Sequence, residues 1–381
     1  MIDCFAAKSA FWIDPQGYVR PCCRYKGRMN HISEFNSFGD ITNSKNYIEI
    51  REELSTDKFP AGCIRCENDE KNNLRSRRQF YNRIKMKSPD DFMVDISMGN
   101  FCNLKCRMCG PQNSTLWNSD YNYLNKIGLI EESKISYADA GFNAYQLSNE
   151  DIDKLIEHLE SVKGKIYLEL KGGEPLIMPQ TELLINRLME LPNSKNITLL
   201  LITNGTVFPD WLYSISKKFC KLLLTVSIDG LGEVYNYIRG TSKFSFDDCF
   251  LNIQKFKSIN NIQLSFNVVV QNLNIHQIID IHLELIKYSN TISYITLELP
   301  NYLALNVMPK LAREKIYQNF LENSTVFGKY ENQMKNIYKL LLIEPNTKDV
   351  ERFQNITTAL DKRRKQNLSS ILPHLIDNSS L

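Results

Sequence analysis

The sequence predicts an α/β protein in which strands and helices alternate around a parallel sheet. From residue 91 onward, a short apolar run is followed each time by a longer amphipathic one, which is the pattern of this class. The chain has 381 residues, of which 43% are hydrophobic, so it can bury the core of one large domain and a smaller one. The expected strands are residues 92–98, 165–170, 197–202, 221–228, 262–270 and 293–299.

Charge and hydropathy exclude several classes of protein. Lys and Arg number 46 against 43 Asp and Glu, so a net charge of +3 gives no overall attraction to nucleic acid or membrane. No run approaches the roughly 18 apolar residues of a membrane span, and the N-terminus lacks the layout of a signal peptide. We therefore expect a cytoplasmic protein without membrane or nucleic-acid partners. In that compartment the clustered ones among its ten cysteines are expected to serve metal or redox chemistry rather than disulfides, whereas Cys220 and Cys249 stand alone and are expected to be small buried hydrophobic residues.

The first segment, residues 1–70, is rich in cysteine. A turn signal at residues 14–17 separates two β-like runs, so we expect a hairpin that brings Cys4 and Cys22 toward each other. Four thiolates at such long-range spacing can close one tetrahedral zinc site or one complete iron–sulfur cluster. The cysteines of this segment are Cys4, Cys22, Cys23, Cys63 and Cys66.

A basic linker helix is expected next, at residues 71–90. Its charge run is typical of a solvated helix face, and contact with an acidic peptide or RNA is the alternative. The basic residues are Arg75, Arg77, Arg78, Arg83, Lys85 and Lys87.

Three closely spaced cysteines, Cys102, Cys106 and Cys109, follow the first strand of the main domain, residues 91–300. Three thiolates can hold three corners of a 4Fe–4S cluster that normally takes four, so the fourth iron stays free for a ligand that is not protein. A zinc site that takes its fourth ligand from elsewhere in the chain is the alternative.

Polar motifs follow the next strands, where barrels carry their chemistry. After the second strand, Gly172 and Gly173 permit close approach of the backbone to a ligand, and the carboxylate of Glu174, which precedes Pro175, suits an ammonium group.

The third and fourth strands also end in polar residues. Short polar side chains after these strands suit ribose hydroxyls, and an arginine suits a carboxylate; ordinary turns are the alternative. The residues are Thr203 and Asn204, then Ser227, Asp229 and Arg239, with Asn267 in the fifth strand as a weaker candidate.

The order of these motifs resembles the radical S-adenosylmethionine (SAM) enzymes. The resemblance rests on Cys102-x3-Cys106-x2-Cys109 followed one strand later by Gly-Gly-Glu-Pro. It implies a partial (β/α)6 TIM-type barrel and a 4Fe–4S cluster whose free iron binds SAM. Reductive cleavage of SAM then gives a 5′-deoxyadenosyl radical that abstracts hydrogen from a substrate. The SAM-binding residues that it implies are Gly172, Gly173, Glu174, Pro175, Thr203, Asn204, Ser227, Asp229 and Arg239, with Met108 where the family usually carries an aromatic residue.

The first segment is similar to a twitch domain, the shortened relative of the SPASM domain. Gly17-x4-Cys22, then residues 39–41 (Gly-Asp-Ile), then Cys63-x2-Cys66 occur in the family's order, although here they precede the barrel. The resemblance implies an auxiliary 4Fe–4S cluster whose ligands are Cys4, Cys22, Cys63 and Cys66, and Cys22 and Cys23 are interchangeable in that assignment. A structural zinc knuckle is the alternative.

The expected function is hydrogen abstraction from a ribosomally made peptide or a protein side chain, with flavodoxin or ferredoxin as reductant. Relatives with SPASM or twitch domains mostly act on such substrates. A small molecule or nucleotide substrate is one alternative, and a non-catalytic iron–sulfur or zinc module is another. The long connection between Cys109 and Gly172 can shape substrate access, and the tail at 301–381 is expected to be helical, notably at 312–321 and 332–342. No catalytic side chain can be named.

Overall fold

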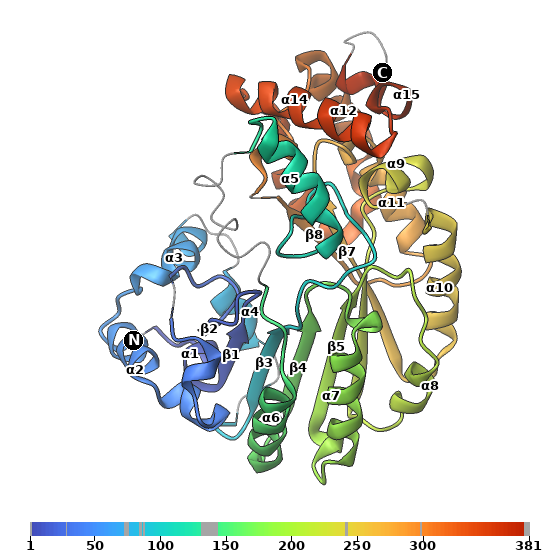
Figure 1. Cartoon of the computed structure of the whole chain (residues 1–381). Coiled ribbons are helices and arrows are strands. Elements are labelled where there is room, and N and C mark those ends of the chain that lie inside the picture. Colours follow the sequence, from blue (N-terminus) through green and yellow to red (C-terminus); the bar gives the residue numbers. More distant parts are fainter. Residues whose placement is uncertain are drawn as a thin grey trace.

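A single eight-stranded sheet organises the molecule (Figure 1). The computed structural model describes residues 2–27, 29–71, 76–83, 86, 88–130, 144–240, 243–297 and 299–376. In the described chain the strand order is β2-β1-β3-β4-β5-β6-β7-β8. The strands are β1 Ala10–Ile13, β2 Val19–Arg20, β3 Phe92–Ser97, β4 Ile166–Lys171, β5 Ile197–Thr203, β6 Lys221–Ser227, β7 Ile262–Val270 and β8 Ile292–Thr296.

Strands β3 to β8 form the predicted barrel. Each pairs in parallel with the next one along the chain, which confirms the partial (β/α)6 fold. The predicted bounds are close to the observed ones, except that β8 ends at Thr296 rather than at residue 299. Along β5, residues 197, 199, 201 and 203 are buried while those between them are only half-buried. One face of the sheet therefore lies under helices, and the other lines a partly open interior.

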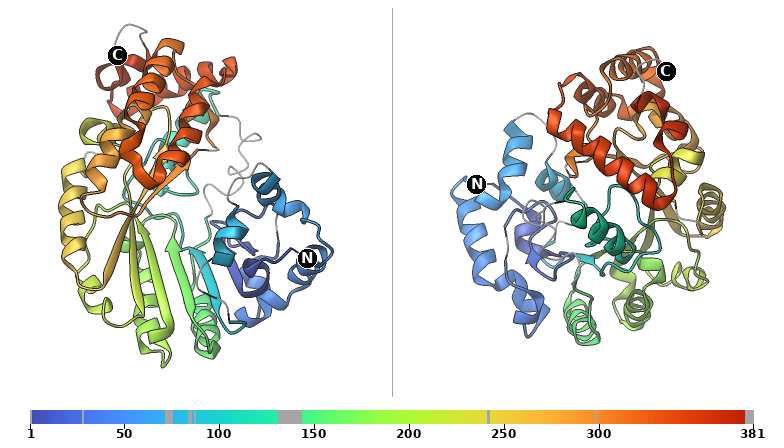
Figure 2. Two further views of the ribbon diagram at one scale, coloured as in Figure 1. Left: turned by 180° about the vertical axis from the view of Figure 1, so that it is seen from behind. Right: turned by 45° about the horizontal axis from the view of Figure 1, so that its top comes forward.

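Helices cover the outer face of the barrel (Figure 2). Two of them, α6 and α10, begin with capping boxes in which Ser148 and Ser245 accept backbone N–H groups of the first turn. These caps fix where the helices start after their loops. The outer helices are α6 Asn149–Ser161, α7 Pro179–Glu190, α8 Trp211–Ile215, α9 Gly232–Ile238, α10 Phe246–Ser258 and α11 Ile278–Leu285.

The N-terminal segment extends the barrel sheet. The predicted hairpin is confirmed, since β1 pairs antiparallel with β2 and Gly17 adopts φ +83° in the turn. Strand β1 also pairs in parallel with β3, from Ala10 beside Met93 to Ile13 beside Ile96, which was not predicted. The first segment is thus joined to the barrel by backbone hydrogen bonds. Its helices are α1 Phe5–Ser9, α2 Lys45–Ser55 and α3 Ile64–Lys71.

The expected basic linker contains α4, Arg77–Arg83. Two of its arginines do not lie on a solvated face: Arg78 pairs with Glu70 at 2.6 Å, and the guanidinium of Arg77 lies 4.7 Å from the ring of Tyr81. The expectation of a solvated helix face is wrong for these two residues, because apolar and acidic neighbours cover them. Residues 75, 85 and 87 lie outside the described residues, as does the side chain of Arg83.

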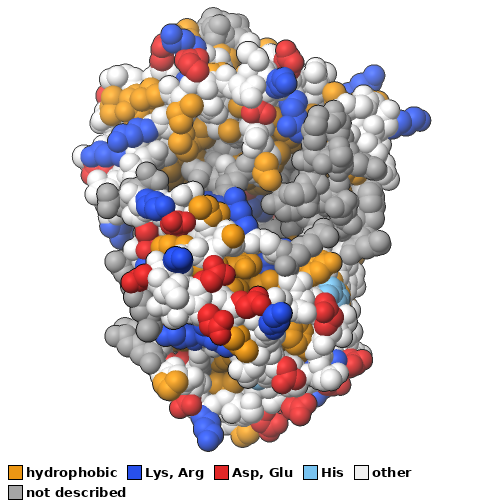
Figure 3. Space-filling model, turned by 90° about the vertical axis from the view of Figure 1, so that its left-hand side faces the viewer, with side chains coloured by type: hydrophobic (Ala, Val, Ile, Leu, Met, Phe, Trp, Pro, Cys, Tyr) orange, Lys and Arg blue, Asp and Glu red, His pale blue; other side chains and the backbone are white. Residues whose placement is uncertain are grey.

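Helices gather at the carboxyl end of the strands, above β3 to β8 in Figure 1. The helical tail is confirmed, and it includes a long helix, α14, that was not predicted. None of the described helices is long and apolar enough to cross a membrane. On the face of the N-terminal segment, acidic and basic side chains are intermingled (Figure 3). The helices at the carboxyl end of the strands are α5 Asn118–Lys126, α12 Lys310–Asn323, α13 Glu331–Tyr338, α14 Thr347–Arg364 and α15 Leu368–Ile371. Residues 131–143, in the long connection before the second barrel strand, lie outside the described residues.

Candidate cluster and cofactor site

The signature loop, residues 99–110, leaves the barrel at the carboxyl end of β3. Its three cysteines lie among hydrogen-bond donors. The Sγ of Cys102 accepts from the backbone N–H of Leu104 at 3.4 Å, and the side-chain amide of Asn204 lies 3.8 Å from it. The guanidinium of Arg239 lies 3.8 Å from the Sγ of Cys106. Donors aimed at sulfur stabilise thiolates and cluster sulfur, so the loop fits an iron–sulfur cluster.

The acidity of these thiols differs from one to the next. A hydrogen bond from the Cys109 thiol lowers the pKa of Cys106 to about 7, and Arg239 acts in the same direction. Burial is the main reason why the pKa of Cys102 rises to about 12. Since iron binds thiolates, filling this loop with a cluster must release protons.

The Gly-Gly-Glu-Pro segment packs directly on the signature loop. Gly172 and Gly173 have φ of +85° and +55°, a region that favours glycine. A Cβ on Gly172 would lie 3.1 Å from the carbonyl oxygen of Gly99, and the N–H of Glu174 donates to the carbonyl of Phe101 at 2.9 Å. The glycines therefore let two loops approach where a larger residue would hold them apart.

Three predicted residues meet around the Glu174 carboxylate, which is fully buried. It accepts the Thr203 hydroxyl at 2.7 Å and the backbone N–H of Asn204 at 2.6 Å on separate oxygens. The N–H of Leu176 adds a third bond at 3.1 Å. Burial raises the pKa of Glu174, although these three hydrogen bonds lower it. The carboxylate ties together the loops after β4 and β5, and its predicted contact with an ammonium group stays a prediction.

Two polar residues that sequence reasoning missed complete this network. The side-chain amide of Asn204 donates to Asn103 at 2.8 Å, and Asn103 donates to the Thr206 hydroxyl at 2.8 Å. That hydroxyl donates back to Asn204 at 2.7 Å. The position of Asn103 inside the cysteine motif was the available signal. The cycle holds Asn204 beside Cys102.

Asp229 and Arg239, both predicted, form a buried ion pair at 2.6 Å. The second oxygen of Asp229 accepts the N–H of Val269 at 2.7 Å. Burial raises the pKa of Asp229, whereas Arg239 lowers it. Asp229 therefore orients the guanidinium that reaches Cys106.

Four other predicted residues are Ser227, Asn267, Met108 and Pro175. Ser227 is half-buried on the inner face of β6, next to its register partner Asn267 on β7. Met108 is half-buried against the core, and Pro175 is buried at the start of a 3-10 turn, Pro175–Ile177. Their contact with SAM stays a prediction.

The C-terminal helix α14 holds the signature loop from outside the barrel. Arg107, between two of the cysteines, pairs with Asp361 and donates to Gln366 at 2.9 Å. Its guanidinium also lies 3.7 Å from the ring centroid of Tyr237. On α5, Asp120 accepts from Arg363 and Arg364 at 2.7 and 2.8 Å and lies 3.4 Å from Lys105. Sequence reasoning missed this clamp, which joins Arg107 and Asp361 across 254 positions of the chain.

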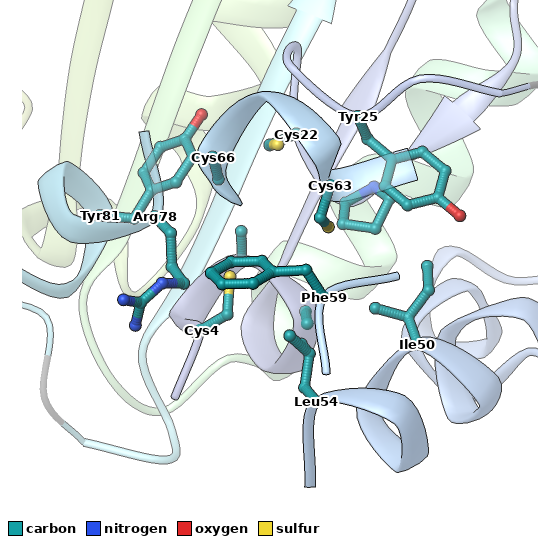
Figure 4. Close-up of a pocket in the computed structure, with 13 residues that line it drawn as sticks. Cys4, Cys22, Tyr25, Ile50, Leu54, Phe59, Cys63, Cys66, Arg78 and Tyr81 are labelled. Atoms are coloured by element: carbon teal, nitrogen blue, oxygen red, sulfur yellow. The ribbon is translucent and has the colours of Figure 1, made fainter. Parts of the chain in front are cut away.

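A second group of cysteines lines one apolar cavity in the N-terminal segment (Figure 4). Cys4 precedes α1, and Cys22 follows β2. Cys63 ends the 3-10 turn before α3, and Cys66 lies in the first turn of α3, so three separate stretches converge. Burial raises the pKa of Cys4 and Cys22 and raises that of Cys63 to about 12. The lining residues are Cys4, Ala6, Ala7, Pro21, Cys22, Tyr25, Ile50, Leu54, Phe59, Cys63, Cys66, Arg78 and Tyr81, so of the adjacent pair it is Cys22 rather than Cys23 that lines the cavity.

The same cavity is lined by all four predicted cysteine ligands. In the described part of the chain, no three Cys, His, Asp or Glu side chains stand close enough together to hold a single metal ion. Thiolates on one zinc ion lie about 3.8 Å apart, because each Zn–S bond is about 2.3 Å long. A cubane separates its ligands further, because each thiolate binds a different iron. A cluster with four cysteine ligands matches the four cysteines that line the cavity.

Two family models match this chain. The Radical SAM superfamily matches residues 96–285, which run from the end of β3 to the end of α11. An iron–sulfur cluster-binding domain, SPASM, matches residues 4–67, which include all five N-terminal cysteines.

Curated relatives match over about half of their length. The GTP 3′,8-cyclase of Aquifex aeolicus (strain VF5) is 25% identical over 189 residues, which are 50% of this chain and 51% of that protein. The GTP 3′,8-cyclase of Picosynechococcus sp. (strain ATCC 27264 / PCC 7002 / PR-6) is 26% identical over 197 residues, 51% of this chain and 52% of that protein.

Two solved structures are similar to this chain at low identity. "Native anSMEcpe with bound AdoMet" is 19% identical with a TM-score of 0.46, covering 65% of this chain and 62% of that one. Streptococcus suis SuiB bound to the precursor peptide SuiA is 15% identical with a TM-score of 0.39, covering 88% of this chain and 65% of the other.

Proposed function

Because the chain belongs to the radical SAM superfamily, we propose that it modifies a ribosomally made peptide or a protein side chain by hydrogen abstraction. It is a radical SAM enzyme, with a 4Fe–4S cluster, SAM and an auxiliary iron–sulfur cluster as cofactors. When bound, the first cluster and SAM together supply the 5′-deoxyadenosyl radical that abstracts hydrogen. The peptide or protein substrate is the part that we propose.

The chain's own residues would divide the work of binding. Cys102, Cys106 and Cys109 would hold the first cluster, since donors from Asn204 and Arg239 reach two of these sulfurs. The auxiliary cluster would be held by the cysteines that line the N-terminal cavity: Cys4, Cys22, Cys63 and Cys66.

SAM would lie over the loops that follow β4, β5 and β6. The backbone of Gly172 and Gly173 borders the signature loop, and Ser227 faces the interior beyond β6. Glu174 and Asp229 would act as positioning residues there, because their carboxylates already bind the Thr203 hydroxyl and Arg239. Closed packing around these groups would keep water from the reacting atoms.

The balance of charges on the inner wall of the barrel is the observation that favours a peptide substrate. On the inner wall of β3 and β4, Asp95 and Glu169 lie with Lys171, and Arg77 is close enough to Glu169 to be influenced by it. These two acidic and two basic groups balance, so this group of four carries no cationic surplus. A nucleoside triphosphate, with several negative charges, needs such a surplus, whereas a peptide amide does not.

A nucleotide substrate is the second candidate, because curated relatives that match this chain are GTP 3′,8-cyclases. That similarity spans about half of each chain, which is the length of the SAM-binding barrel. It therefore supports the shared cofactor chemistry more strongly than a shared substrate.

Anaerobic incubation with SAM and dithionite tests the proposal. The reconstituted protein should form 5′-deoxyadenosine, and a peptide encoded by a short reading frame beside the gene should stimulate this and change in mass. GTP should do neither. Consumption of GTP would contradict the peptide proposal and support a nucleotide substrate. Absence of 5′-deoxyadenosine under all conditions would support the alternative of a non-catalytic iron–sulfur module.

A further inference from the structure

A row of polar side chains crosses the inner wall of the barrel. The strand register places Arg20, Trp12, Asp95 and Glu169 side by side on β2, β1, β3 and β4. Because side chains alternate along a strand, Lys171 faces the same side as Glu169, two residues earlier on β4. The row begins in the N-terminal segment and ends at the loop that carries Gly172 and Gly173.

Lys171 is held at the end of this row by two carboxylates. Its Nζ lies 2.5 Å from Asp95 and 3.0 Å from Glu169. Burial opposes the positive charge, but Asp95 and Glu169 outweigh it and raise the pKa of Lys171 above its ordinary value. Lys171 is therefore an ammonium at neutral pH, fixed in direction by its two partners.

One donor of this ammonium has no hydrogen-bond partner within the residues that the structure describes. A lysine ammonium carries three N–H donors, and the carboxylates of Asp95 and Glu169 account for two. The Lys171 side chain keeps 23% of its surface exposed, whereas those of Asp95 and Glu169 keep 4% and 8%. Lys171 is thus the most accessible side chain of the three.

An aromatic side chain lies next to this donor. The ring of Trp12 is half-buried, and its centroid lies 5.8 Å from the Nζ of Lys171. Two polar atoms of the row, Nε1 of Trp12 and Oδ1 of Asp95, are shielded from solvent and have no hydrogen-bond partner in the described structure. Unpartnered polar atoms destabilise a fold, and well-packed apolar residues would usually replace such a charged group at no loss of stability. The group is therefore better explained by binding than by folding.

We propose that Lys171 and Trp12 bind a peptide amide of the substrate, with Lys171 donating to its carbonyl oxygen and the Trp12 ring lying against its plane. This inference rests on the proposed function and names the substrate group that the inner wall recognises. Asp95 and Glu169 act as positioning residues, because they orient the ammonium and, when both are ionised, offset its charge. Because two carboxylates offset the charge of the Lys171 ammonium, a neutral carbonyl is a better ligand for it than a phosphate is.

The test follows Trp12 directly by fluorine NMR of holoenzyme labelled with 5-fluorotryptophan. The chain has three tryptophans, so Trp12→Phe identifies the Trp12 signal by its loss. The probe is acetyl-Gly-Gly-N-methylamide at millimolar concentration, with GTP in a parallel titration. The Trp12 signal should shift saturably with the peptide and not with GTP, and the Trp117 and Trp211 signals should stay in place.

Variants then test Lys171. Lys171→Met should weaken peptide binding about fivefold, the effect of one lost hydrogen bond. Lys221→Met, at an exposed lysine that begins β6, is the matched control and should bind like wild type. If Lys171→Met does not fold, the double variant Asp95→Asn with Lys171→Gln removes the buried charge as well and should bind equally weakly.

Unchanged affinity in the folded Lys171 variant, a Trp12 signal that does not respond, or tighter binding of GTP than of the peptide would each overturn the inference. The formation of 5′-deoxyadenosine from SAM is measured in the same wild-type preparation. If it persists while the peptide result fails, only the inference falls. If no 5′-deoxyadenosine forms, the proposed function is contradicted as well as the inference.

Discussion

The two cysteine sites are built in opposite ways. In the signature loop, the sulfurs lie among donors and cations. The residues that follow β5 and α9, together with α5 and α14, hold the loop in place. In the N-terminal cavity, the sulfurs come from three separate stretches, and the other lining residues are mostly apolar, with Arg78 as the charged member. The first site is organised by the protein around it, whereas the second needs something in its centre to hold its walls together.

The largest expected effect separates the two sites by chemistry. Replacing Cys102, Cys106 and Cys109 with Ala should reduce 5′-deoxyadenosine formation to background and lower bound iron from about eight atoms per chain to about four. The Cys63→Ala, Cys66→Ala double variant should lose the same amount of iron from the other site. Iron retained in full by either variant would contradict the assignment of that site.

The second prediction concerns folding. The Cys63→Ala, Cys66→Ala variant should expose the N-terminal segment to proteases, because its apolar walls lose their shared centre. The signature-loop variant should leave that segment protected, since protein contacts hold its own loop. Equal protease sensitivity of the two variants would remove the contrast between the sites.

The third prediction tests the clamp on the signature loop. Arg107→Ala leaves Asp361 without its buried partner, so the free energy of unfolding should fall by about 3–5 kcal/mol. The matched control is Arg187→Ala, whose partner Asp153 is exposed and whose loss should cost less than about 1 kcal/mol. Denaturant unfolding measures both. A similar cost for the two would mean that α14 does not stabilise the loop.

The fourth prediction uses the pH dependence of stability at the inner wall. Burial, with Glu169 adding to it, raises the pKa of Asp95 to about 7, from about 3.9 in an unfolded chain. Between these values the folded state holds the extra proton, so the stability from this group is present below pH 4 and lost as pH rises to 7. Asp95→Asn should therefore gain stability relative to wild type across this window, as measured by thermal unfolding at a series of pH values. A constant difference would contradict the shift.

The smallest expected effect is on redox potential. Hydrogen bonds to cluster sulfur and its ligands raise the potential, so Asn204→Ala should make that of the first cluster more negative. The auxiliary cluster is the internal control, because no described contact joins Asn204 to its cysteines. A shift in the auxiliary potential alone would point to the wrong assignment of the two signals.

The sequence predicted the barrel because its six strands are short apolar runs with local patterns. It did not predict that β1 pairs with β3, since that pairing joins Ala10 and Met93, which no local pattern links. Likewise, Asp229 and Arg239 were identified as site residues, but their mutual ion pair was not. The clamp between Arg107 and Asp361 was missed because each looks like an ordinary charged helix or loop residue on its own.

The ligand set of the N-terminal site could be predicted only in part from the sequence. Spacing alone allowed zinc or a cluster, and Cys22 and Cys23 were interchangeable. The fold brings Cys22 to the cavity with Cys4, Cys63 and Cys66, a choice made by the hairpin geometry rather than by the sequence around the pair.

Electron paramagnetic resonance of the dithionite-reduced protein, with and without SAM, tests the central contrast most directly. Two 4Fe–4S signals are expected, and SAM should change only the one that disappears in the Cys102, Cys106, Cys109→Ala variant. A SAM-dependent change that survives in that variant, or a single zinc ion in place of either cluster, would contradict the account.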